Sequence, residues 1–168
     1  PMFSLYAKVA RLQGAALTEV PPREDFTFDA DALAGAVRET GAKLTVLTTP
    51  NNPTGRAMTL DEIERVAAAS SGIVVVDEAY VEFNSEPSAV ELIDEYPNVM
   101  VMRTLSKGFG LAGLRLGYLI ARPPVVKELM KARLPFMVGR FAEQTALSVL
   151  RRPELIEERV RRMQVSIT

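Results

Sequence analysis

The chain has 168 residues, with 20 basic and 21 acidic side chains, and 48% of its residues are hydrophobic. This length is enough for one domain with a substantial core, and the net charge of −1 excludes the strong positive field of a nucleic-acid-binding protein. The sequence has no cysteine and no histidine, which excludes disulfides, thiolate nucleophiles, Ser-His-Asp triads and the commonest zinc sites. Any catalysis must therefore use Lys, Asp, Glu, Tyr, Arg or hydroxyl side chains, and we expect no metal site.

The ends of the chain and its hydropathy set two further expectations. No apolar run reaches the roughly 18–20 residues that span a bilayer, and nothing resembles a signal peptide, so we expect a cytoplasmic protein without membrane contacts. The chain starts at Pro1 without an initiator methionine and stops at Thr168 within a helical pattern. We expect it to be a piece of a longer protein.

The first elements alternate between helix and strand. Residues 2–14 place apolar side chains on one helical face, and a short strand is expected over residues 15–20, ended by two prolines that lack backbone donors. A helix is expected over residues 29–41, between an aspartate cap and a terminal glycine. Residues 44–48 then form an apolar strand.

The middle of the chain repeats this alternation. Residues 49–55 contain two prolines, two asparagines and a glycine, and therefore predict a turn. Residues 59–69 predict a helix that starts with a Thr-Leu-Asp-Glu capping box. Residues 73–76 predict a buried strand, which leads into Asp77 and Tyr80.

The last third begins with a strand over residues 99–103 that leads into a loop carrying Lys107. A further strand is expected over residues 117–121, and a helix with prolines at its start over residues 123–130. Two more helical patterns cover residues 143–150 and 153–165.

The predicted strands are continuous apolar runs with almost no polar alternation. Strands of this kind are covered on both faces, which predicts an α/β fold: a three-layer α/β/α sandwich with a mainly parallel sheet. Ligands of such sheets bind beyond the carboxyl ends of the strands, and right-handed crossovers place those ends at one edge.

Three successive strands end in polar chemistry at this predicted edge. Asn51 and Asn52 follow the first, Asp77 and Tyr80 follow the second, and Thr104, Ser106 and Lys107 follow the third. Each has a simpler interpretation taken singly: Asn52 as a turn former, Asp77 as a helix cap, Tyr80 as packing and Lys107 as a solvated loop residue. Their occurrence together at one edge favours a functional site.

Two segments of the sequence partly match nucleotide-binding motifs, but neither match is complete. Gly108, Gly110 and Gly113 match the spacing G-x-G-x-x-G, but a short strand is expected to follow them, and no acidic residue ends a second strand about 20 residues on. The apolar run into Asp77 and Glu78 is similar to the acidic motif of P-loop hydrolases, yet no G-x-x-x-x-G-K-[ST] accompanies it. We instead interpret the glycines as room for backbone near a bound phosphate.

The binding of pyridoxal phosphate needs a particular set of side chains. The set found here matches it: a lysine, a buried acid, a phenol, an asparagine, two hydroxyls and an arginine. The motifs at residues 51–55, 76–80 and 104–118 resemble those in the large domain of fold-type-I pyridoxal-phosphate aminotransferases (class I/II), and are most similar to the histidinol-phosphate aminotransferases. The resemblance covers nearly the whole chain. It implies that residues 1–168 are an incomplete cofactor-binding large domain.

The resemblance assigns roles around the cofactor ring. Lys107 binds the cofactor covalently and, once the substrate amine has released it, moves a proton between substrate and cofactor carbons. Asp77 pairs with the pyridine nitrogen. Asn52 and Tyr80 donate hydrogen bonds to the phenolic oxygen.

The resemblance also assigns the phosphate site and the ring face. Thr104, Ser106 and Arg115 bind the phosphate, where an arginine offers a bidentate fork. Phe3 stacks on the ring, although its position on a helical face also suits a core residue. A glycine-containing phosphate loop before Pro1, a small domain after the chain and residues of a second subunit complete the site in this family.

The activity implied is amino-group transfer between glutamate and 2-oxoglutarate on one side and histidinol phosphate and its keto acid on the other, in histidine biosynthesis, by a homodimer. Two alternatives stay open. One is a related pyridoxal-phosphate enzyme, either an aminotransferase for aromatic or other amino acids or a decarboxylase of a phosphorylated amino acid. The other is an inactive fragment that serves as a folded binding module.

Overall fold

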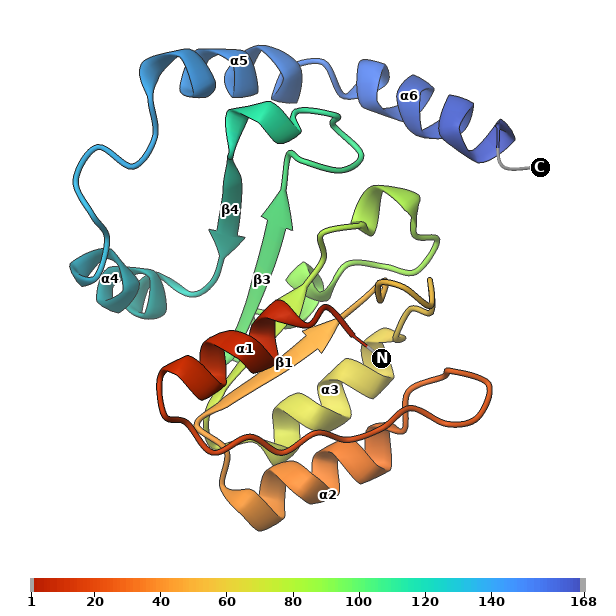
Figure 1. Ribbon diagram of the computed structural model, residues 1–168, viewed down its shortest axis with the longest axis vertical. Coiled ribbons are helices and arrows are strands. Elements are labelled where there is room, and N and C mark those ends of the chain that lie inside the picture. The colour runs from red at the N-terminus through yellow and green to blue at the C-terminus, as the bar shows by residue number, and fades with distance from the viewer. Residues whose placement is uncertain (1, 167–168) are drawn as a thin grey trace.

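A central sheet organises the computed structural model, which describes residues 2–166 (Figure 1). Within these residues the sheet has four strands in the order β1-β2-β3-β4. The strands are β1 (Leu44–Thr48), β2 (Ile73–Asp77), β3 (Val99–Thr104) and β4 (Gly117–Ile120). The first three are parallel, and β4 runs antiparallel to β3. The expected α/β fold with a mainly parallel sheet is confirmed.

The helices start and end close to where the sequence predicts. They are α1 (Leu5–Leu12), α2 (Ala30–Thr40), α3 (Leu60–Ala69), α4 (Pro123–Lys131), α5 (Arg140–Leu150) and α6 (Pro153–Val165), with short 3₁₀ turns η1 (Val81–Phe83), η2 (Ala89–Leu92) and η3 (Ala112–Leu114). The Asp29 side chain accepts the Ala32 N–H at 3.0 Å at the start of α2, and Gly41 ends that helix in the left-handed conformation. Thr59 and Glu62 form the predicted capping box of α3.

The strand predicted over residues 15–20 is absent, and this prediction was wrong. These residues form no regular secondary structure, and residues 15–19 are all exposed. A strand is stable only when a neighbouring strand takes its backbone hydrogen bonds and one face is buried. Neither condition is met, because the segment instead crosses the outside of the molecule between α1 and α2 (Figure 1).

The main core lies between the sheet and the layer formed by α2, α3 and η2. It contains Val66 of α3, Val74 and Val76 of β2, and Val99 and Val101 of β3, all of them fully buried. These aliphatic side chains alternate along β2 and β3, so one face of each strand packs against the helices. The amino end of β1 departs from the expected burial, because Leu44 lies on an edge strand and is 59% exposed.

The register of the parallel strands aligns their carboxyl ends. Thr48 pairs with Asp77, and Asp77 pairs with Met102. The polar segments that follow β1, β2 and β3 therefore leave the sheet at the same edge, as the sequence predicts. This alignment positions the site described below.

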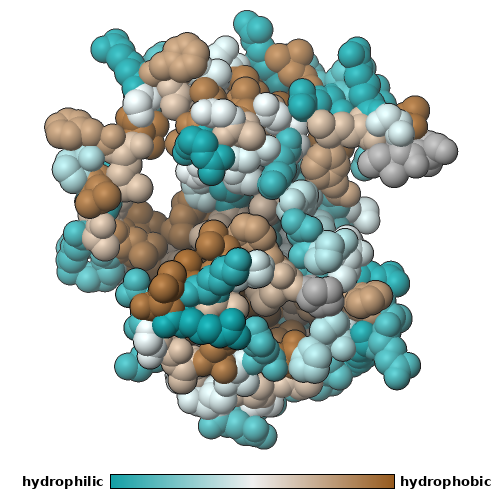
Figure 2. Space-filling view, viewed as in Figure 1, coloured by the Kyte–Doolittle hydropathy of each residue, from teal (hydrophilic) through white to brown (hydrophobic). Residues whose placement is uncertain are grey.

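Several apolar side chains remain on the surface. Leu5, Val9 and Leu12 of α1 are exposed, and Figure 2 shows hydrophobic surface gathered over this helix. A second group, the α4–α5 apolar cluster, consists of Leu134, Phe136, Met137 and Phe141, which are 61–97% exposed. Patches of this kind commonly mark contacts with other protein surfaces.

We searched the helices of residues 2–166 for one that could cross a bilayer. None of them combines the necessary length with the necessary hydropathy.

Candidate active site

Three of the predicted site residues lie together at the carboxyl edge of the sheet. Asn52 Nδ2, from the turn after β1, donates a hydrogen bond to the Tyr80 hydroxyl at 3.2 Å. The Lys107 Nζ atom, from the loop after β3, lies 5.3 Å from the centroid of the Tyr80 ring. Tyr80 follows β2, the middle of the three parallel strands. It therefore contacts both the turn after β1, through Asn52, and the loop after β3, through Lys107. Asn52 and Lys107 are exposed and Tyr80 is half-buried, so a ligand can reach all three.

Asp77 ends β2 and has both carboxylate oxygens engaged. The Ala79 backbone N–H donates to Oδ1 at 3.0 Å, and the Tyr6 hydroxyl of α1 donates to Oδ2. Burial, followed by the hydrogen bond and the negative charge of Asp77, raises the pKa of Tyr6 well above its ordinary value. The Tyr6 hydroxyl thus stays protonated and acts as a donor.

Phe3 contacts Tyr6, which in turn donates its hydrogen bond to Asp77. The two rings meet edge to face, with centroids 6.0 Å apart and an interplanar angle of 83°. Phe3 is 48% exposed, so it is no core residue. The pattern over residues 2–14 predicted only an apolar helix face and gave Tyr6 no role of its own. Phe3 precedes α1, which begins at Leu5, and its ring contacts Tyr6 in the first turn of that helix.

Of the three predicted phosphate ligands, Thr104 ends β3, and Ser106 and Arg115 lie on the segment that joins β3 to β4. The Ser106 backbone N–H donates to Thr104 Oγ1 at 3.1 Å, which folds this turn tightly beside Lys107. Arg115 follows η3 in the left-handed conformation with φ of 52°, and its guanidinium donates to the Ala112 carbonyl at 2.9 Å. The guanidinium is therefore held within its own turn.

Comparison with known proteins identifies the family. The model of the aminotransferase class I and II family matches residues 1–168, which is the whole chain. The chain belongs to this family.

Two relatives with high sequence identity to this chain are both histidinol-phosphate aminotransferases. A histidinol-phosphate aminotransferase of Chlorobaculum tepidum is 49% identical over 160 residues, which are 95% of this chain and 46% of that protein. One of Thermobifida fusca is 48% identical over 153 residues, which are 90% of this chain and 42% of that protein. The family member described here thus spans about half the length of these relatives.

Solved structures of this family share the fold. Histidinol-phosphate aminotransferase from Sinorhizobium meliloti, in complex with pyridoxal-5'-phosphate, superposes with a TM-score of 0.86 at 29% identity, over 95% of this chain and 44% of that one. L-threonine-O-3-phosphate decarboxylase from Porphyromonas gingivalis superposes with a TM-score of 0.82 at 26% identity, over 98% of this chain and 49% of that one. The shared fold therefore extends to enzymes named for different reactions.

A buried ion pair lies directly behind the site of this aminotransferase-family chain, and the sequence reasoning missed it. Glu78, next to Asp77, is 2% exposed and pairs with Arg103 at 2.8 Å. The Glu78 carboxylate also accepts the Ser88 hydroxyl and the Ala89 N–H, at 2.7 to 3.0 Å. Burial is the largest single influence on the pKa of Arg103 and lowers it, but the hydrogen bonds and charges of Glu78 and Tyr118 together outweigh burial and raise that pKa. No spacing rule in the sequence marks this network.

We expect Arg103→Met to destabilise the protein by about 3 kcal/mol, because the Glu78 carboxylate would stay buried without its cation. Urea unfolding of the full-length protein measures the change. Arg65→Met is the matched control, since Arg65 pairs with Asp31 at 3.0 Å where both side chains are at least half exposed, and such pairs add little stability. Equal losses in the two variants would contradict the expected role of the buried pair.

Two of the glycines after Lys107 lie close to side chains of other elements. A Cβ atom at Gly108 would lie 2.7 Å from Glu82 Cβ, and one at Gly110 would lie 2.4 Å from the Arg159 guanidinium. Gly110 also has φ of +68°, which disfavours other residues. The sequence pattern was interpreted as room for a phosphate alone; in the structure, close packing against Glu82 of η1 also favours glycine at Gly108, while the positive φ favours it at Gly110, where the flexible Arg159 side chain could move aside. No long helix follows these glycines, because the next elements are η3 and β4.

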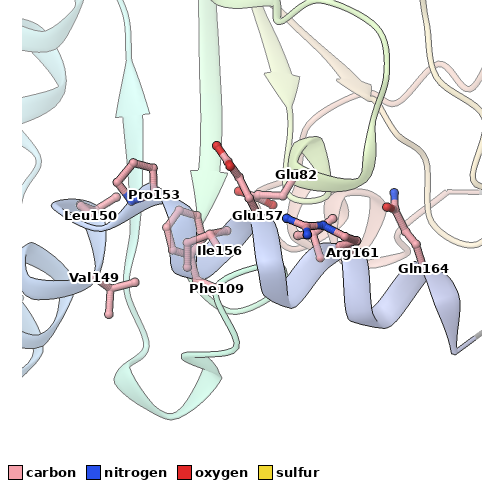
Figure 3. A pocket seen from close by; sticks show the side chains of 10 residues that line it. Glu82, Phe109, Val149, Leu150, Pro153, Ile156, Glu157, Arg161 and Gln164 are labelled. Carbon is pink, nitrogen blue, oxygen red and sulfur yellow. The ribbon is translucent and has the colours of Figure 1, made fainter.

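A groove at the other end of the described chain lies outside the cluster of Asn52, Tyr80 and Lys107. It has a volume of about 520 Å³ and runs between η1, Phe109 and the helices α5 and α6. Figure 3 shows Glu82 on one side of it and Glu157, Arg161 and Gln164 of α6 on the other. Burial raises the pKa of Glu82. None of the predicted site residues lines this groove, so it is separate from the polar strand ends that carry the candidate chemistry.

Proposed function

We propose that the full-length protein is a pyridoxal-phosphate-dependent aminotransferase, and specifically a histidinol-phosphate aminotransferase of histidine biosynthesis. The observation that carries this proposal is the meeting of Asn52, Tyr80 and Lys107 at the carboxyl edge of the sheet, where Asp77 ends β2. The names of relatives at 48% and 49% identity support the substrate. A cytoplasmic location belongs to the same proposal.

The residues present fit the cofactor by their chemistry. A primary amine at Lys107 suits an aldehyde, and a carboxylate at Asp77 suits a protonated pyridine nitrogen. Asn52 and Tyr80, already hydrogen-bonded to each other, offer donors to a phenolic oxygen. The hydroxyls of Thr104 and Ser106 suit a phosphate. Phe3, which is 48% exposed, offers an aromatic side chain for stacking.

We assign the steps of the reaction to side chains of this chain. Bound pyridoxal phosphate supplies an electron sink for negative charge on the substrate α-carbon. Lys107 Nζ would hold the aldehyde carbon of the cofactor and, once the substrate amine has freed it, would take up the proton released at the substrate α-carbon. Asp77 keeps the proton on the ring nitrogen. Asn52 and Tyr80 orient the ring through its phenolic oxygen.

Further contacts hold the cofactor in place. Thr104, Ser106 and Arg115 bind the phosphate, with Arg115 turning its guanidinium from the Ala112 carbonyl toward the anion. Phe3 covers one face of the ring. Several of these side chains are exposed in residues 2–166, which supports completion of the site by other segments.

We also propose how the chain fits into the whole enzyme. Residues 1–168 form part of the cofactor-binding large domain, and the remaining half of the relatives' length supplies a phosphate loop and a small domain. The full-length protein is a homodimer that takes glutamate or 2-oxoglutarate and histidinol phosphate as small-molecule partners. The exposed α4–α5 apolar cluster supports a subunit contact at that surface.

A second candidate function is decarboxylation of a phosphorylated amino acid. The match to the Porphyromonas gingivalis enzyme, at a TM-score of 0.82, favours it over other unrelated chemistry. Both reactions need the same lysine and aspartate and a phosphate-bearing substrate. They differ in which bond of the α-carbon is broken, so the products separate them.

The test is a product assay with the full-length protein and pyridoxal phosphate. Glutamate is supplied with imidazole-acetol phosphate, aromatic keto acids and other keto acids in turn, and phosphothreonine is tested for release of carbon dioxide. We expect imidazole-acetol phosphate to be the best acceptor. Faster turnover of an aromatic keto acid would reassign the substrate, and carbon dioxide release would favour the second candidate. No reaction with any of them, despite bound cofactor, contradicts the transferase proposal and supports a binding module.

A further inference from the structure

Tyr6 connects α1 to the end of β2 across 71 residues of sequence. Its hydroxyl donates to Oδ2 of Asp77, while the Ala79 backbone N–H donates to Oδ1. The carboxylate is therefore held at both oxygens, by the turn that follows β2 on one side and by α1 on the other. A carboxylate oxygen can accept more than one hydrogen bond. Each Asp77 oxygen therefore keeps the capacity to accept an N–H of a ligand.

The same side chain also supports Phe3. The Tyr6 and Phe3 rings meet edge to face with centroids 6.0 Å apart, where the chain enters the first turn of α1. This arrangement restricts the Phe3 ring while leaving that side chain 48% exposed. One residue thus contacts both groups that are assigned to the ring of the cofactor, Asp77 at its nitrogen and Phe3 at its face.

The hydrogen bond between Tyr6 and Asp77 joins α1 to the sheet, and α1 buries little apolar surface of its own. No residue of α1 is fully buried, and three of its apolar side chains, Leu5, Val9 and Leu12, are 47–84% exposed. The position of α1 relative to β2 therefore depends strongly on the hydrogen bond between Tyr6 and Asp77. A donor to a charged acceptor is also stronger than one between neutral groups.

We propose that Tyr6 is a positioning residue of the cofactor site: its hydroxyl fixes the Asp77 carboxylate and its ring fixes Phe3, so that both are set for a planar protonated ring between them. This role rests on the function proposed above. It requires that loss of the hydroxyl weakens cofactor binding even when the fold is intact.

The test uses Tyr6→Phe in the full-length protein, because this change removes only the hydroxyl and keeps the ring contact with Phe3. Apoenzyme is titrated with pyridoxal phosphate, and we expect the Kd to rise about tenfold, the effect of losing one hydrogen bond to a charged group. We also expect the visible absorbance of the bound cofactor to shift, and kcat to fall with little change in the KM for glutamate. Thermal unfolding of the apoenzyme is measured in parallel.

Tyr96→Phe is the matched control. The Tyr96 hydroxyl donates to the Glu64 carboxylate at 2.8 Å, away from the polar strand ends. This variant loses the same kind of hydrogen bond, and we expect it to bind cofactor as the wild type does. Tyr6→Leu removes the ring as well and is expected to weaken binding further than Tyr6→Phe.

The outcomes separate this role from the proposed function. If the wild type fails to bind pyridoxal phosphate, the proposed function is wrong and the role of Tyr6 falls with it. If the wild type binds and Tyr6→Phe shows the same Kd and spectrum, Tyr6 has no positioning role, whatever happens to the thermal stability. If Tyr6→Leu binds as Tyr6→Phe does, the ring contact with Phe3 contributes nothing.

Discussion

Replacing Lys107 with alanine is expected to lower amino-group transfer by the full-length protein by on the order of 10⁴-fold, the upper range for loss of a proton-transfer group. The amine lies 5.3 Å from the Tyr80 ring centroid, and in our proposal it both binds the cofactor and moves the proton at the substrate α-carbon. Steady-state turnover of glutamate measures the loss.

A chemical label provides the second measurement for this variant. Borohydride reduction in the presence of pyridoxal phosphate should attach the cofactor to Lys107 in the wild type, located by peptide mapping, and leave the Lys107→Ala protein unlabelled at the site. Lys131→Ala is the control, because Lys131 is exposed on α4 and pairs only with the neighbouring Glu128. Specific labelling of another lysine in the wild type would refute the assignment.

Replacing Asp77 with asparagine is expected to lower turnover by on the order of 10³-fold, the cost of removing one preorganised electrostatic group. Asparagine has nearly the same shape and can still accept the Ala79 N–H, but it has no charge to keep a proton on the ring nitrogen. The variant should therefore retain the fold and lose mainly kcat. Turnover at saturating glutamate, together with cofactor content, measures the effect.

The control for this variant is Asp94→Asn, whose side chain is 94% exposed in its pair with Arg122. We expect it to keep wild-type turnover. If Asp77→Asn keeps it too, Asp77 does not act on the cofactor, and its hydrogen bonds to Tyr6 and Ala79 are only structural. An unfolded Asp77→Asn protein, recognised by its circular dichroism, would likewise assign Asp77 a structural role.

Much of the fold could be predicted from local sequence signals. The Asp29 cap and Gly41 delimit α2, and the Thr59–Glu62 capping box starts α3, because each satisfies backbone groups within a few residues. The apolar runs of β1, β2 and β3 predict buried parallel strands for the same local reason. Residues 15–20 fail this test, since an extended segment becomes a strand only if another strand lies beside it.

The candidate site was predictable to a smaller extent. Asn52, Tyr80 and Lys107 were expected at one edge, because the carboxyl ends of parallel strands share it, and their mutual contacts agree with that expectation. Their catalytic roles remain predictions. The contact between Tyr6 and Asp77 was not foreseen, because α1 has no fixed relation to β2 in the sequence.

The sequence by itself determined the elements, their order and the polar residues that end each parallel strand around Lys107. These features depend on hydrogen bonds and apolar periodicity over a few residues. The tertiary structure alone decided that α1 brings Tyr6 to Asp77, that Glu78 is buried against Arg103, and that Gly108 and Gly110 face η1 and α6. Such contacts join residues 25 to 71 positions apart, and they depend on how whole elements pack.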